Sequence, residues 1–264
     1  MLRALTATAT LICAGGAWAH PEIEAALSRL NADIAARPTA AALYLERGEL
    51  YARHDDAVAA EANYLRAAEL APELPRLNIA RGALELAGGR PAEARRLLDP
   101  VLARTPQDIE ARVLRARALA ALKEPAAAVT DFNTALAATA TPSPDLYLER
   151  AALLPPAAAL LSIDEGIARL GPTLALQLRA LALEESLGRI DAAARRITQV
   201  AAQSERKESW LKRRGDLFTR AGRFREARTS YLEALSRIAD LPDWLRASPE
   251  VKQLANELHR LSNS

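Results

Sequence analysis

The chain of 264 residues is poor in several residue types, and each shortage excludes a class of protein. Its only cysteine is Cys13, so disulfides, cysteine metal sites and cysteine nucleophiles are excluded from the chain after that point. Aromatic residues make up only 4% of the chain, and β-branched residues are also sparse, which excludes a fold built of many strands. The 35 basic and 33 acidic residues nearly cancel. Bulk electrostatic binding of nucleic acid or an anionic membrane needs an excess of one sign, so we predict neither partner.

Residues that carry chemistry are equally few. The three histidines, His20, His54 and His259, are too scattered to build a metal site or to pair a base with a nucleophile. The glycines of LAGGRPAEA fit a turn between helices and not a phosphate-binding loop. We therefore predict no catalytic residue, no metal, no cofactor and no enzymatic activity.

The first nineteen residues have the pattern of an export signal. Arg3 supplies one early positive charge, an uncharged and mostly apolar run covers 4–16, and AWA is a small-x-small motif that predicts cleavage between Ala19 and His20. A transmembrane helix needs about 20 apolar residues, and this run is shorter and interrupted. We expect a periplasmic or secreted protein without membrane insertion after cleavage. An uncleaved N-terminal anchor stays open as the alternative.

After the signal, four columns of residues recur every 34 positions. The columns are Gly48, Gly82 and Ala116; Ala60, Ala94 and Ala128; Tyr64, Leu98 and Phe132; and Ala67, Val101 and Ala135. Gly188 and Gly222 continue the period further along the chain. Between the two blocks, Pro155-Pro156 replaces the usual turn and one unit is short by about four residues. A fixed period of this length is typical of a protein built from stacked helix pairs.

The pattern resembles the tetratricopeptide repeat (TPR) family, with a small residue in a first helix, an alanine and an aromatic in a second, and a proline at the end of each unit. The resemblance covers nearly all of the chain after residue 19 and implies an all-α fold, a right-handed α-solenoid of helix-turn-helix units. Tyr44 and Tyr147 match the large aromatic of the family's first helix, whereas Asn78 and Arg112 do not. We expect residues 20–264 to comprise a half unit at 20–40, six units near 41–74, 75–108, 109–143, 144–173, 174–207 and 208–241, and a C-terminal cap at 242–264.

The packing of these units can also be anticipated. The small residues let paired helices approach closely, and Tyr64, Leu98 and Tyr231 are expected to fill the gap between successive pairs. An arginine precedes most of the small residues, at Arg47, Arg81, Arg115, Arg150 and Arg214. Such a ladder would suit an anionic ligand. We favour the alternative that the stems pack between helices while the heads pair with nearby acids.

The predicted binding site is the concave surface that first helices line in TPR-like stacks. Two residues before each arginine position the side chain is aliphatic in five units, at Leu45, Ile79, Val113, Leu148 and Leu178. The polar neighbours are Glu46, Glu49, Arg117, Glu149 and Arg179. This surface would suit an extended peptide or an amphipathic helix. The alternative is that the aliphatic residues only complete the packing between first helices.

The sequence therefore predicts an exported scaffold or adaptor that binds an unidentified protein or peptide, and the family and the export signal together suggest a role in envelope assembly or secretion. One alternative is a structural solenoid that self-associates or tethers complexes, with the exposed contact at Trp244. A second is a small-molecule binding or catalytic protein, which would need a pocket of converging polar groups. The short unit around Pro155 is expected to bend the stack or alter its pitch. The oligomeric state is not predicted.

Overall fold

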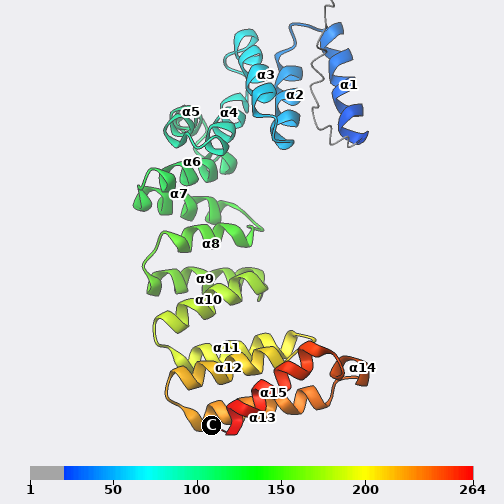
Figure 1. Ribbon diagram of the computed structural model, residues 1–264. Coiled ribbons are helices and arrows are strands. Elements are labelled where there is room, and N and C mark those ends of the chain that lie inside the picture. Colours follow the sequence, from blue (N-terminus) through cyan, green and yellow to red (C-terminus); the bar gives the residue numbers. More distant parts are fainter. Residues whose placement is uncertain (1–20, 264) are drawn as a thin grey trace, which may run out of the picture. The chain divides into compact units, whose positions relative to one another are not determined.

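The computed structural model describes residues 21–263, so the expected cleavage site between Ala19 and His20 lies outside the described part of the chain. Within these residues the protein forms fifteen α-helices and no strand, as the predicted all-α solenoid requires (Figure 1). The described residues divide into two compact units, the first ending at Leu98 and the second beginning at Asp99. The helices are α1 (Pro21–Ala36), α2 (Ala41–Arg53), α3 (Ala57–Leu70), α4 (Leu77–Ala87), α5 (Pro91–Arg104), α6 (Ile109–Ala121), α7 (Pro125–Ala138), α8 (Pro144–Ala152), α9 (Pro156–Leu170), α10 (Leu174–Ser186), α11 (Ile190–Gln203), α12 (Glu208–Arg220), α13 (Phe224–Ala239), α14 (Asp243–Arg246) and α15 (Pro249–Asn263).

Consecutive helices pack in pairs inside each compact unit. In the first unit α2 packs on α3, and this pair contacts α1 and α4. In the second unit the pairs are α6 with α7, α8 with α9, α10 with α11 and α12 with α13, and each pair contacts the next through α7 and α8, α9 and α10, or α11 and α12. A single pair cannot bury both of its apolar faces, so this stacking supplies the hydrophobic core.

A residue in the left-handed conformation follows the first helix of most pairs. Gly89, Gly188 and Gly222 occupy this position with φ of 70°, 68° and 73°. Asp55 and Lys123 hold the equivalent position with φ of 60° and 64°. A left-handed residue lets backbone N–H groups reach back to the last carbonyls of the helix and ends it, and glycine does so without steric cost. The turn between the two helices of a pair is therefore set by local chemistry.

The shortened unit around Pro155 lies within the second compact unit. Its first helix, α8, has nine residues, against thirteen in α6 and α10. Pro156 begins α9, where its missing N–H costs nothing because the first helical residue has no intrahelical acceptor. α8 still packs on α9 and also contacts α10, so the chain remains stacked here. The predicted change in bend or pitch stays a prediction.

Glycines of the first helices make room for aromatic rings of the second helices. A Cβ atom at Gly48 would lie 2.5 Å from Cε1 of Tyr64, and one at Gly215 would lie 2.2 Å from Cε1 of Tyr231. Each ring lies against the glycine of its own pair, and Tyr64 also shares a core with Leu77 of the next pair. The rings are 2% exposed.

The last long helix covers the C-terminal pair. α15 packs on α13, with Val251 and Leu258 buried and Leu254 and Leu261 partly buried in the core shared with α13. Lys252, by contrast, is exposed. Across residues 21–263, no helix combines the length and the apolar character that a membrane span requires.

Candidate binding surfaces

Arg150 of α8 joins three helices through one guanidinium group. Its Nε donates to Ser162 Oγ of α9 at 2.9 Å, and its Nη1 donates to Asn133 Oδ1 of α7 at 2.9 Å. Its Nη2 contacts Glu165 Oε2 of α9 at 2.5 Å. The arginine therefore ties its own helix to its partner helix and to the second helix of the preceding pair. We call this arrangement the arginine clamp.

The same clamp recurs at other positions of the predicted arginine column. In each case Nε bonds the partner helix and Nη1 bonds the preceding second helix. The contacts are Arg47 to Asn63 at 2.8 Å and to Asn31 at 2.6 Å, Arg115 to Asp131 at 2.7 Å and to Asp99 at 3.1 Å, and Arg214 to Ser230 at 3.0 Å and to Thr198 at 2.9 Å. These heads bond groups within the protein. Arg115, Arg150 and Arg214 pair with acids, as the favoured interpretation predicted, whereas Arg47 bonds two asparagines.

The clamp is missing from one repeat. Arg81 of α4 forms no hydrogen bond or ion pair with the described residues, and the positions equivalent to its two partners are occupied by Leu65 and Leu97. A leucine side chain cannot accept a hydrogen bond, so the Arg81 guanidinium has no acceptor at either position. Repeats that share the arginine therefore differ in whether it links helices.

The clamp is inverted in the pair formed by α10 and α11. Arg196 on the second helix supplies the guanidinium, which donates from Nε to Glu184 Oε2 at 2.9 Å and from Nη1 to Gln177 Oε1 at 2.8 Å. Its Nη2 reaches Asp164 Oδ1 of α9 at 3.0 Å. Burial lowers the pKa of Arg196, but the bonds to Glu184 and Asp164 outweigh it, and the net pKa is raised. The arginine stays charged. It joins the same three kinds of helix, but here the second helix carries the donor and the first helix carries acceptors.

The predicted aliphatic stripe divides into buried and open members. Leu45 and Ile79 are only 8% and 3% exposed, so they belong to the packing between helices and cannot meet a partner. Their assignment to an open groove is therefore corrected. Val113, Leu148 and Leu178 are half-buried at the same position of α6, α8 and α10. These three retain surface that another molecule can cover.

Ion pairs link the first helices around these three residues. Arg117 of α6 donates two hydrogen bonds to the carboxylate of Glu149 on α8, at 2.8 and 2.9 Å. The bonds to Glu149 raise the pKa of Arg117. Glu185 of α10 accepts from Arg213 at 3.4 Å and from Arg220 at 3.0 Å, both on α12. Neighbouring first helices are thus held together at their exposed edges.

The other predicted polar residues are not drawn into such pairs in the second unit. Arg179 of α10 is exposed and bonds to none of the described residues. In the first unit Glu46 is exposed, and Glu49 accepts from Arg76 at 3.5 Å. The surface formed by Val113, Leu148 and Leu178 with Arg117, Glu149 and Arg179 is called the first-helix surface below.

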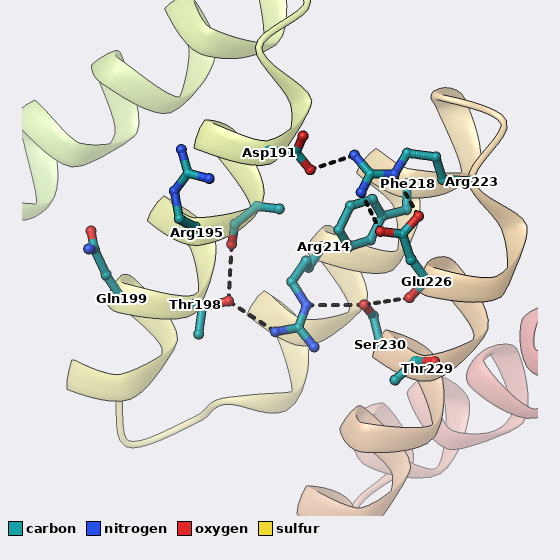
Figure 2. Close-up of a pocket in the computed structure, with 11 residues that line it drawn as sticks. Asp191, Arg195, Thr198, Gln199, Arg214, Phe218, Arg223, Glu226, Thr229 and Ser230 are labelled. Carbon is teal, nitrogen blue, oxygen red and sulfur yellow. Dashed lines mark hydrogen bonds and ion pairs between the residues drawn. The ribbon is translucent and has the colours of Figure 1, made fainter.

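A cleft of about 640 Å³ lies elsewhere, between α11, α12 and α13 (Figure 2). Sequence reasoning missed it because most of its lining comes from the second helices α11 and α13, which were assigned no binding role. Arg223 contacts Asp191 at 2.6 Å and the carboxylate of Glu226, and lies 4.7 Å from the ring centre of Phe218. The bonds to Glu226 and Asp191 raise the pKa of Arg223. The bond between Arg223 and Glu226 also lowers the pKa of Glu226.

The charged groups in this cleft mainly satisfy one another. The guanidinium of Arg214 bonds Ser230 and Thr198, as Figure 2 shows, and only Arg195 and Gln199 on α11 are exposed without a described partner. The cleft therefore lacks the converging free polar groups that a small-molecule site needs. In residues 21–263 no three His, Cys, Asp or Glu side chains cluster closely enough to hold a metal ion. Trp244, the candidate contact for self-association, is 76% exposed on α14.

Comparison with known proteins agrees with this geometry. The family described as tetratricopeptide repeat matches residues 79–143 and 179–242. A search of curated proteins found no match. A TPR protein from Parabacteroides merdae has a similar structure, with a TM-score of 0.56 and 19% identity, over 92% of this chain and 93% of that one.

Two further solved structures share the fold. PilW, described as a widely conserved type IV pilus biogenesis factor, has a TM-score of 0.62 at 21% identity and aligns over 72% of this chain and 91% of its own. YrrB, described as a TPR protein with an unusual peptide-binding site, has a TM-score of 0.50 at 16% identity over 66% of this chain and 91% of its own. The matched repeats, the stacked helix pairs and these shared folds show that the chain is similar to tetratricopeptide-repeat proteins in its repeats and in its α-solenoid fold.

Proposed function

We propose that this protein is a scaffold that binds a partner protein through the first-helix surface of its second compact unit. The observation that carries the proposal is the partial exposure of Val113, Leu148 and Leu178 at one position of three successive first helices. Covering such side chains yields about 0.8 kcal/mol for each CH₂ group removed from water. A partner that buries several of them at once would gain affinity without any cofactor.

The charges around the stripe define what the partner should look like. The Arg117–Glu149 pair satisfies both of its charges, so it stabilises the surface and does not attract ligand charge. Arg179 is exposed and unpaired, and can bind a carboxylate. The surface therefore suits a peptide segment or amphipathic helix that places an acidic residue beside its apolar side chains. The described peptide-binding site of YrrB supports this class of ligand.

The direct test is a crosslinking pulldown from the cell envelope with the Leu148→Glu and Leu178→Glu variants. Each change puts a charge in the stripe, and we expect each to remove the partners that the unmodified protein recovers. Leu161→Glu is the matched control, because Leu161 is 71% exposed on the second helix α9. Recovery of the same partners by all four proteins would show that the first-helix surface does not bind them.

We also propose that the protein works in the bacterial envelope after export. The N-terminal signal pattern supports this location, as does the fold that the chain shares with PilW, described as a pilus biogenesis factor. The protein purified from its own cells should then begin at His20. Mass spectrometry of the intact protein measures this directly. A mass that includes the first nineteen residues would contradict cleavage and favour the uncleaved anchor.

A further inference from the structure

We infer that the outer face of α13 is a second docking site, and that it binds an acidic peptide segment that carries an apolar anchor side chain. The α13 face is formed by Phe224, Arg225, Arg228 and Leu232. Residues 224, 228 and 232 are spaced four apart, which places them along one stripe of a helix. Phe224 is 69% exposed and Leu232 is 48% exposed, so both ends of the stripe are open and apolar.

Two unpaired cations lie three residues apart on this face. Arg225 and Arg228 are exposed and form no side-chain hydrogen bond or ion pair with the described residues. The arginines just before them behave differently, since Arg220 bonds Glu185 and Arg223 bonds Asp191. A planar guanidinium binds carboxylates through paired hydrogen bonds. Arg225 and Arg228 are therefore available for acidic groups of another molecule.

A cavity beside the two arginines supplies the place for an apolar anchor. Its volume is about 330 Å³, and its walls come from α12, α13 and α15. Leu261 of α15 lines it, together with Ala227 and the buried ring of Tyr231. The Tyr231 hydroxyl already bonds Asp216 and Thr219 at 3.0 and 2.9 Å. Few polar groups are left to bind inside the cavity, so the group that enters should be apolar.

The small number of free charges favours a peptide over a membrane or a nucleic acid. Sites for anionic lipid clusters typically use about 4–8 lysines and arginines. Proteins that bind DNA strongly typically make about 6–10 phosphate contacts. Two unpaired arginines beside a pocket sized for one side chain fall short of both. One or two carboxylates next to an aromatic or aliphatic residue complement the face in charge and in shape.

This site is separate from the first-helix surface, so each can fail without the other. The α13 face and its cavity use residues of α12, α13 and α15, whereas the first-helix surface uses α6, α8 and α10. Changes on α13 should therefore leave binding of the scaffold's partner unchanged. Leu178→Glu should likewise leave binding of the acidic peptide to the α13 face unchanged.

The experiment uses a display library of random twelve-residue peptides selected on the purified protein. We expect the selected peptides to combine acidic residues with a large apolar residue. Their synthetic versions should bind at least tenfold more weakly to the double variant Arg225→Glu/Arg228→Glu, and also more weakly to Phe224→Ala. Leu178→Glu should bind them unchanged. The matched control is Arg195→Glu, which reverses another exposed, unpaired arginine away from this cavity.

The variants at Phe224, Arg225, Arg228 and Arg195 change exposed residues, Leu178 is half-buried, and thermal unfolding checks that each variant remains folded. Selection of peptides without acidic residues, or equal binding to the double variant and to the Arg195→Glu control, would overturn the inference. So would a library that yields no binder. Binding of phosphatidylglycerol vesicles or single-stranded DNA that depends on Arg225 and Arg228, without any selected acidic peptide, would replace the peptide by that ligand.

Discussion

At the scale of single residues, the arginines mainly form hydrogen bonds and ion pairs between helices. Arg150 is 7% exposed, and its three nitrogen atoms bond groups on α7 and α9. A buried guanidinium is costly to desolvate, and only a full set of acceptors offsets that cost. A lysine could not replace it, because a single ammonium group does not reach in three fixed directions.

Replacement of Arg150 by alanine should lower the free energy of unfolding by about 2 kcal/mol, through the loss of bonds to a charged group and of packing by its stem. Urea unfolding measures the change. The control is Arg179→Ala, which removes an exposed arginine without a described partner and should change stability by less than about 0.5 kcal/mol. Equal effects of the two changes would show that the clamp does not stabilise the stack.

At the scale of helices and pairs, most of the architecture could be predicted from the sequence. The small residue that recurs every 34 positions, as Gly48, Gly82 and Ala116, locates the helix pairs. Close approach of two helices and the turn between them both depend on local residue type. The ring that occupies the space is less predictable. In the pair of α8 and α9 the roles are exchanged, and a Cβ atom at Gly166 of the second helix would lie 2.8 Å from Cγ of Tyr147.

The inverted clamp of Arg196 could not be predicted from the sequence. Ala180 interrupts the arginine column, which signals only that something differs in that repeat. Arg196 on α11 compensates because Asp164 of α9 and Gln177 and Glu184 of α10 converge on it, and no sequence period relates these positions on two other helices. Likewise, the burial of Leu45 and Ile79 depends on how tightly neighbouring helices cover them, so equal positions in the period gave unequal exposure.

At the scale of the whole molecule, the repeats form a stacked frame, and we propose that a few exposed residues on it bind the partner. Clamps and ion pairs satisfy most of the arginines, so their number does not by itself make a binding site. We assign binding to two small surfaces of the described residues, the half-buried stripe with Arg179 and the α13 face. A partner is therefore expected to contact a limited part of this protein.

Site-specific photo-crosslinking in cells tests the central proposal most directly. A photo-crosslinking amino acid in place of Leu178 should form an adduct of defined mass with a partner protein. The same amino acid in place of Leu161, which is exposed on the second helix α9, should form none. An adduct at position 161 with none at position 178 would contradict the assignment of the partner to the first-helix surface.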